Sequence, residues 1–282
     1  MTRGTRRRKL VSSAFVAFCA ASVLLALVPL AFVLFFVVTQ GIQSLNLAFF
    51  THMPAPVGEA GGGMANAIVG TLILVSLGAL FAVPVGILSG IYMSEYAGTR
   101  FASLIRFAAD TLNGVPSIVI GVFVYGIAVL PFKQFSALAG GLALGVMMIP
   151  IIARTTEELM LLVPGTMREG ALALGATHAR AVFTVVVPAA LPGIITGLVL
   201  AVARIAGETA PLLFTSLNNR FFTTTLTRPI SSLTVQVYTY ASSPYQDWHR
   251  QAWAGALVLV AIVLSCSLLA RFATRKLETL GR

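Results

Sequence analysis

Two oppositely charged residues lie close together at the end of an apolar stretch. Arg204 and Glu208 follow residues 181–203, which contain no Asp, Glu, Lys or Arg. A spacing of four places both on one face, provided that a helix continues through them. Charges in an apolar environment are costly, so they pair with each other or line a polar cavity. A guanidinium fork suits an oxyanion, and Glu208 would neutralise Arg204 when no anion is bound. The pattern predicts either a structural ion pair or a weak, releasable anion site.

A polar pair with the same spacing occurs earlier in the chain. Asn113 and Ser117 flank Gly114 and Pro116. Proline interrupts a helix and frees backbone groups, which is tolerated in a membrane where the backbone lines a water-filled cavity. The segment predicts either a simple helix start or one wall of a polar path.

The elements that position these residues are apolar helices. The chain is 57% hydrophobic and 10% charged, whereas a soluble domain carries about 25% charged residues. A helix needs roughly 20 apolar residues to cross the hydrocarbon of a bilayer. Stretches without Asp, Glu, Lys or Arg that meet this length are 10–58, 60–94, 111–132, 134–153, 181–203 and 251–270. With helices near 11–38 and 66–92 in the two long stretches, the sequence predicts an all-α integral membrane protein with six transmembrane helices.

The basic residues indicate an orientation. The net charge is +10, and most of the 19 Lys and Arg residues fall on one side when the N-terminus is placed in the cytoplasm. This is the positive-inside pattern, so both termini are expected in the cytoplasm. The first apolar run is too long for the core of a cleaved signal peptide. Nucleic-acid binding is excluded, because the basic residues flank apolar runs and form no basic stripe with interleaved aromatics.

One predicted cytoplasmic loop carries its own helix signals. Pro164 suits a helix start, Glu169 lies in the early turns, and Gly175 suits a helix stop. A second helix then enters the membrane near Val185. The product is a short surface helix tethered at both ends, which could transmit force from a soluble partner.

This loop resembles the coupling loop of binding-protein-dependent ABC importers. The family pattern is Glu-Ala-Ala, three residues, Gly, nine residues and Ile-x-Leu-Pro. The residues that match in register are Glu169, Ala171, Gly175 and Pro188, while Gly170, Val185 and Val187 are conservative replacements. The resemblance implies that the loop docks into a groove of an ATP-hydrolysing subunit through Glu169, Gly170, Ala171 and Gly175.

Three further segments resemble the phosphate branch of that family, the PstA-type permeases. They are residues 66–71, 113–119 and 204–212, and with the loop the resemblance covers roughly residues 65–270. It implies a type I importer permease that forms half of the transmembrane path for inorganic phosphate. The candidate path residues are Arg204, Glu208, Thr209, Asn113 and Ser117.

The resemblance also implies partners and a location. The chain has no Gly-x-x-x-x-Gly-Lys-Ser/Thr phosphate loop, so ATP and Mg²⁺ are expected in a partner ATPase and no cofactor in this chain. The expected partners are a second homologous permease subunit, a dimer of ABC ATPase subunits and an external phosphate-binding protein, within the bacterial plasma membrane. The expected divisions are an N-terminal tail, first helix and outer loop (1–64), a transmembrane domain (65–271) and a cytoplasmic tail (272–282).

Other functions stay open at this point. The path could serve another oxyanion such as molybdate, sulfate or phosphonate. A proton-coupled secondary transporter could use Glu208 as its carrier, but would leave the loop motif unexplained. An enzyme is disfavoured, because no nucleophile, base or metal cluster is apparent in the sequence. Glu95 and Asp110, which flank the third predicted helix, are expected to be solvated.

Overall fold

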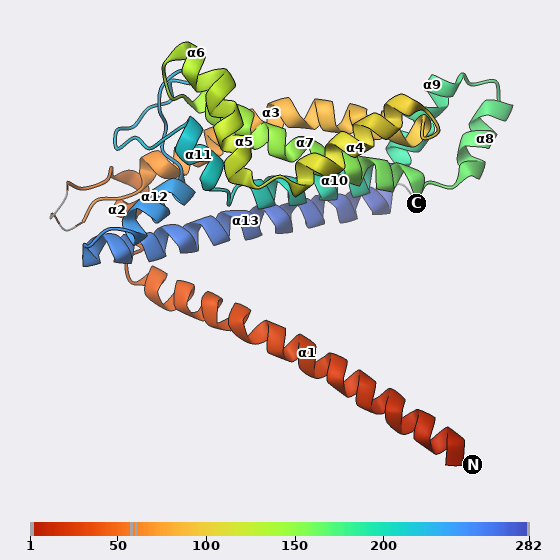
Figure 1. Ribbon diagram of the computed structural model, residues 1–282, viewed down its shortest axis with the longest axis horizontal. Coiled ribbons are helices and arrows are strands. Elements are labelled where there is room, and N and C mark those ends of the chain that lie inside the picture. The colour runs from red at the N-terminus through yellow and green to blue at the C-terminus, as the bar shows by residue number, and fades with distance from the viewer. Residues whose placement is uncertain (1–2, 57–58, 60, 281–282) are drawn as a thin grey trace.

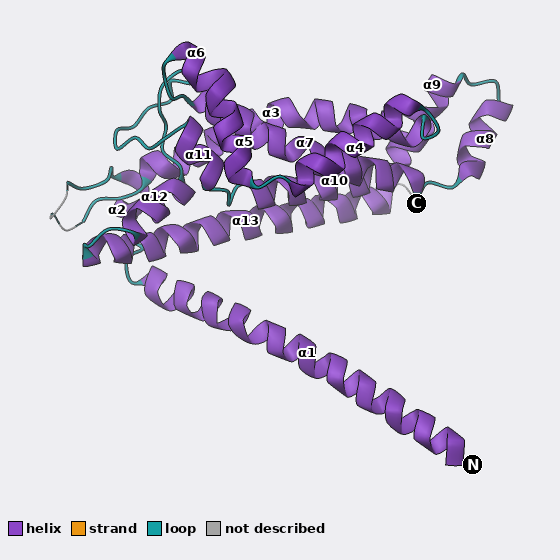
Figure 2. Ribbon diagram, viewed as in Figure 1, coloured by secondary structure: helices purple, strands orange, loops and turns teal. Residues whose placement is uncertain are grey.

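The computed structural model describes residues 3–56, 59 and 61–280. Its regular elements are helices joined by loops, with one isolated bridge between Pro54 and Gly62 (Figure 2). The all-α prediction is confirmed.

Five helices are long and apolar enough to cross a membrane. They include α1 (Arg3–Ile42), α3 (Ala65–Glu95), α7 (Ala137–Leu161) and α13 (Gln246–Leu280). The fifth runs from His178 to Ile205 and combines α9 (His178–Ala181), the π-helical turn η2 (Val182–Val186) and α10 (Val187–Ile205). Because α13 continues to Leu280, it passes through the expected boundary at 271; that division of the chain stays a prediction, and residues 281–282 lie outside the described residues.

The third predicted span is bent rather than straight. Helix α4 (Arg100–Gly114) is followed by α5 (Ser117–Val124), the π-helical turn η1 (Tyr125–Val129) and α6 (Leu130–Phe132), with a bend of 106° between the two arms. Val115 is extended (φ −73°, ψ 129°) because Pro116 disfavours the helical conformation in the residue before it. Among the described residues, the number of candidate spans is therefore five, or six if the bent pair counts as one span.

The centre of the bundle is the pair α3 and α7 (Figure 1). Glycines let the two backbones approach closely. A Cβ on Gly78 would lie 3.1 Å from Leu144 Cβ, and one on Gly86 would lie 2.8 Å from Ile152 Cβ. In the most apolar 18-residue stretch of α7, 61% of the residues are buried, which makes α7 the core helix.

Helix α1 is the opposite case. It diverges from the bundle (Figure 1), and only 6% of its most apolar 18-residue stretch is buried. Its C-terminal part packs on α13, where a Cβ on Gly41 would lie 2.8 Å from Leu257 Cβ. Residues 11–36 of α1 present exposed, mostly apolar side chains, which fits a lipid or protein environment outside this chain.

Short helices occupy the two ends of the bundle. Helix α8 (Gly165–Ala173) lies at one end, called here the α8 end, and α2 (Leu47–Thr51) and α12 (Leu233–Ala241) lie at the other, the α12 end (Figure 1). Between α10 and α12 the chain forms α11 (Ala210–Thr215) and an irregular segment. That segment is anchored to α3, because Thr71 Oγ1 accepts a hydrogen bond from Leu233 N at 2.8 Å and Asn66 Nδ2 donates to Asn219 O at 2.6 Å.

Candidate functional site

A polar hollow of about 250 Å³ lies where α5, α7 and α10 meet. Four of the five predicted path residues line it, although they come from two distant parts of the sequence. These are Asn113, Ser117, Arg204 and Glu208. Met147 and Ile151 of α7 supply an apolar wall. Thr209 stands instead at the N-terminus of α11 and is not part of the lining.

The break between α4 and α5 presents the first two of these residues. Asn113 lies in the last turn of α4, and Ser117 is the first residue of α5. The interrupted backbone leaves N–H groups of the first turn of α5 without helical partners, and such groups favour negative charge nearby. Both predictions for this segment therefore describe the same feature: the helix start is also a wall of the hollow.

The predicted ion pair between Arg204 and Glu208 is wrong. Helix α10 ends at Ile205, and the next residues form a tight turn in which Gly207 N donates to Arg204 O and Glu208 N to Ile205 O. The two residues therefore do not share a helix face. Neither belongs to an ion pair within 4.0 Å among the described residues. Arg204 is exposed and Glu208 half-buried, and both residues line the hollow.

The turn that carries Glu208 is held in place from α12. Thr234 Oγ1 donates a hydrogen bond to the backbone oxygen of Glu208 at 3.0 Å. On the other side, Pro211 of α11 packs on α5, where a Cβ on Gly121 would lie 2.6 Å from Pro211 Cα. The Glu208 carboxylate is therefore positioned through its backbone and stays available to the hollow.

The predicted surface helix is present as α8. It begins after Pro164 and ends at Ala173 with Leu174 as its C-cap, and Gly175 follows with φ +85°, a conformation that glycine adopts without strain. Gly175 N donates to Leu172 O, and Ala176 N donates to Ala171 O, which closes the helix end. No residue of α8 is buried, and the helix projects from the bundle (Figure 1). Of the predicted contact residues, Glu169, Gly170 and Gly175 are exposed and Ala171 is half-buried.

Glu95 is not solvated as expected. It is the last residue of α3, and its side chain is 4% exposed. Arg168 Nη2 lies 2.6 Å from Glu95 Oε1, and His178 Nε2 lies 3.3 Å from Glu95 Oε2. A sequence signal existed, because a carboxylate at a helix C-terminus is unfavourable and calls for basic partners.

A second charged cluster joins α4 to α7 between the hollow and the α8 end. Glu157, 3% exposed, forms ion pairs with Arg106 and with Arg154, the latter at 2.6 Å. Arg154 Nε also lies 3.1 Å from Asp110 Oδ1. The expectation of a solvated Asp110 holds for its half-exposed side chain but missed this pair. Arg154 and Glu157 are close in sequence, but Arg106 lies 51 residues from Glu157, so no local pattern reveals the cluster.

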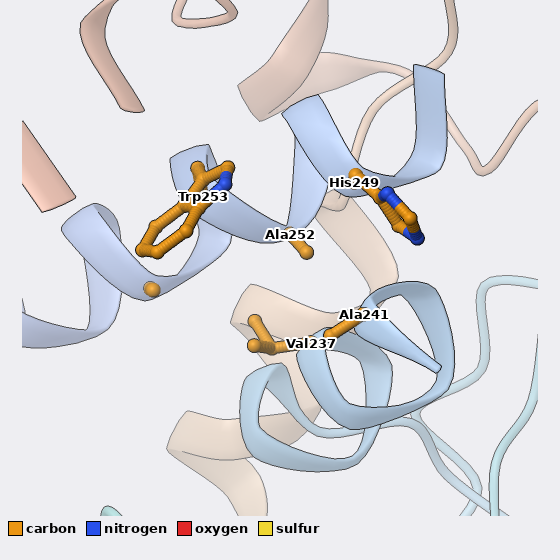
Figure 3. Close-up of a pocket in the computed structure, with 6 residues that line it drawn as sticks. Val237, Ala241, His249, Ala252 and Trp253 are labelled. Atoms are coloured by element: carbon orange, nitrogen blue, oxygen red, sulfur yellow. The ribbon is translucent and has the colours of Figure 1, made fainter. Parts of the chain in front are cut away.

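Another hollow, of about 290 Å³, lies between α12 and α13 (Figure 3). Its lining is largely apolar and includes Val237, Ala241, Ala252 and Trp253. His249 also borders it and is engaged with Ser243 O at 2.6 Å. None of the predicted path residues borders this hollow. Within the described residues, no group of three His, Cys, Asp or Glu residues could hold a metal ion.

Proteins similar in sequence have a common name. "Phosphate transport system permease protein PstA" of Yersinia pestis is 46% identical over 259 residues, which cover 91% of this chain and 88% of that protein. Its counterpart in Haemophilus influenzae is 44% identical, covering 89% of each chain. An archaeal protein named probable PstA, from Methanocaldococcus jannaschii, is 35% identical over 95% of each.

Solved structures of similar fold are ABC transporters. The chain matches a bacterial alginate ABC transporter with a TM-score of 0.67 and 15% identity, covering 97% of this chain and 96% of the other. It matches the MetNI methionine ABC transporter with a TM-score of 0.60 and 20% identity, covering 76% and 94%. The type I ABC importer permease fold is confirmed. Residues 82–279 match the family described as binding-protein-dependent transport system inner membrane component, and the chain belongs to that family.

Proposed function

We propose that this chain is the permease subunit of an ATP-driven importer and forms half of the transmembrane path for inorganic phosphate. The observation that carries the proposal is the hollow in which Arg204 and Glu208, unpaired with each other, meet Asn113 and Ser117. The names of the relatives supply the substrate, since each is called a phosphate transport permease.

Arg204 is proposed to contact the anion. Arg204 is exposed and lines the hollow, and its guanidinium offers several N–H donors in one plane. Asn113 and Ser117 add neutral donors. Glu208 faces the same space, and its negative charge weakens anion binding, which favours release. A transport path requires this balance, because a tightly held ion would not leave.

The proposed partners follow from the exposed helix α8. We propose that α8 docks on a separate ABC ATPase through Glu169, Gly170, Ala171 and Gly175, with the α8 end in the cytoplasm. A second homologous permease would complete the path, and a phosphate-binding protein would deliver the ion at the α12 end. ATP and Mg²⁺ would belong to the ATPase dimer, and this chain would bind no cofactor and catalyse no reaction. The location would be the bacterial plasma membrane.

The mechanism is alternating access. Closure of the ATPase dimer on ATP would move α8, and the bundle would then open toward the α12 end and accept phosphate. Hydrolysis would return the bundle to the state that is open toward the cytoplasm. Such cycles require an element with two arrangements that the partner can bias.

The test is uptake of labelled phosphate into cells that lack their own high-affinity system and express this chain with its partners. Uptake is expected to need an active ATPase and to resist excess sulfate and molybdate. Arg204→Gln removes hydrogen bonds to a charged ligand and should lower uptake about tenfold or more, whereas Glu158→Gln on the exposed end of α7 should not. Competition by sulfate or molybdate would instead assign another oxyanion, and uptake with a hydrolysis-dead ATPase would indicate a secondary transporter.

A further inference from the structure

The end of α3 is tied to the coupling segment by one carboxylate. Glu95 receives Arg168 from α8 on one oxygen, at 2.6 Å, and His178 from α9 on the other, at 3.3 Å. Arg168 and His178 lie on either side of the Gly175 turn. A single side chain of the membrane domain therefore contacts both arms of the protruding α8–α9 segment.

This carboxylate depends on its partners. Glu95 ends α3, where the partial negative charge of the helix dipole disfavours a second negative charge. Its side chain is also 4% exposed, so water does not compensate the charge. Removal of one partner from a buried pair leaves an uncompensated charge, which is strongly unfavourable. Removing one partner is therefore expected to cost more here than in a pair of the same residue types that is fully exposed.

The surroundings of the tie give it a fixed geometry. The ring of His178 lies 6.1 Å from that of Tyr96, which stacks on Tyr92 at 5.0 Å. Helix α8 itself buries no residue. Among the described residues, Arg168 forms the ion pair that α8 makes with the end of α3.

Arg168 also has an unused donor. Its Nε atom is buried without a hydrogen-bond partner. A guanidinium can bind a carboxylate through Nε and Nη2 together, as a bidentate pair. A small shift of α8 toward Glu95 would satisfy this donor and displace His178 from the second oxygen. Arg168 therefore has a donor left for a second contact with Glu95.

Movement at Glu95 has a short path to the polar hollow. Near its Glu95 end, α3 is locked to α7: a Cβ on Gly90 would lie 2.5 Å from Thr156 Cβ. Helix α7 in turn supplies Met147 and Ile151 to the hollow. Close-packed helices move as bodies, so a displacement of the end of α3 is passed to α7.

We infer that Glu95 is a positioning residue for transport: it ties α8 to α3 so that movement of α8 reaches the α3–α7 pair beside the hollow. The inference rests on the proposed function, in which a partner ATPase moves α8. It adds to that function a specific link between the docking helix and the membrane domain.

The test uses the complete importer in proteoliposomes and measures phosphate transported per ATP hydrolysed. Glu95→Gln and Arg168→Met each break the pair, and each should lower this ratio about tenfold while hydrolysis continues. Glu158→Gln, an exposed carboxylate on the same end of the bundle, should keep the wild-type ratio. Wild-type ratios in both pair-breaking variants would overturn the inference. If the importer with Glu95→Gln does not assemble, the transport ratio of Arg168→Met, which changes the α8 partner of the pair, tests the inference.

Reversing the two charges tests whether Glu95 and Arg168 act through their mutual attraction or only through a structural role of each residue. The double variant Glu95→Arg/Arg168→Glu restores an opposite pair and places a cation at the C-terminus of α3, where the dipole favours it. The ratio should return to within about threefold of wild type. A double variant as uncoupled as the single ones would show that this pair does not act through its mutual attraction, which overturns the inference.

Gly175→Val tests coupling through α8 separately from the link through Glu95. At φ +85° any side chain strains the end of α8, although there is space for one. If Gly175→Val leaves the ratio unchanged, coupling through α8 is wrong and the proposed function fails. If Gly175→Val uncouples the importer and the Glu95 and Arg168 variants do not, the proposed function stands and the link through Glu95 fails.

Discussion

The charges near the hollow and the charges near the α8 end contrast sharply. Arg204 and Glu208 face one space without pairing with each other. Nearer the α8 end, the side chains of Glu157 and Glu95 are 3% and 4% exposed, and each contacts two basic residues. The same residue types therefore serve two purposes: paired charges hold helices together, and charges that are left unpaired beside a hollow remain available to a ligand.

The difference arises from local backbone. Arg106 and Arg154 sit within continuous helices α4 and α7, whose packing brings Glu157 between them. Arg204 lies one residue before the end of α10. Glu208 lies in the turn that follows, so its side chain does not project from the helix face that carries Arg204. Where a helix ends, the four-residue spacing no longer produces a pair.

The largest expected effect concerns the paired charges around Glu157. Glu157→Ala leaves Arg106 and Arg154 without their shared carboxylate, and breaking such a buried pair costs about 3 kcal/mol or more. Thermal unfolding of the detergent-purified protein should show a clear loss of stability, whereas Arg204→Met should change it by no more than about 0.5 kcal/mol. Equal losses in the two variants would contradict the distinction between structural and ligand-facing charges.

The next effect concerns the close contact between α3 and α7 at Gly90, which lies between the Glu95 cluster and the hollow. Gly90→Ala would place a Cβ 2.5 Å from Thr156 Cβ, and overpacking of this kind costs about 1–3 kcal/mol. The matched control is Gly126→Ala, where a Cβ would have no neighbour within 4 Å. The same unfolding measurement should separate them, and a Gly90→Ala protein as stable as the control would show that α3 and α7 can move apart easily.

A smaller effect tests the ligand-facing side. Glu208→Gln removes the negative charge that opposes anion binding, so phosphate should be held longer. In uptake assays on the full importer, the KM and the maximal rate should each fall about threefold, the pattern expected when ground-state binding strengthens. Asp247→Asn, an exposed carboxylate near the start of α13, is the control. An unchanged KM would mean that Glu208 does not interact with the bound anion.

Much of the fold was predictable because lipid imposes long apolar helices. The spans at α3, α7, α10 and α13 follow from uncharged stretches of sufficient length. The ends of α8 were predictable too, since Pro164 and Gly175 act through local backbone preferences. The bend at Pro116 was anticipated only as a possible helix start, because hydropathy reports length and not direction.

The residues of the site could be predicted from the sequence, but the contacts between them could not. Asn113 and Ser117 were selected as one pair and Arg204 and Glu208 as another, and the structure brings both pairs to one hollow. The predicted Arg204–Glu208 pair assumed a helix that in fact ends at Ile205. Glu95 was expected in water because its partners lie more than 70 residues further along the chain, and tertiary contacts of that kind leave no local pattern.

The smallest expected effect separates Thr209 from its neighbours. Thr209 was selected with the path residues, but it stands at the start of α11, makes no side-chain capping hydrogen bond and does not line the hollow. Thr209→Ala should therefore keep phosphate uptake within about twofold of wild type, as expected for a substitution that removes no defined interaction. Thr234→Ala is the informative comparison, because its hydroxyl holds the backbone oxygen of Glu208 at 3.0 Å. Loss of that hydrogen bond should lower uptake more than Thr209→Ala does. The reverse order would mean that the ligand-facing region extends beyond the hollow to the start of α11, and that the position of Glu208 does not depend on α12.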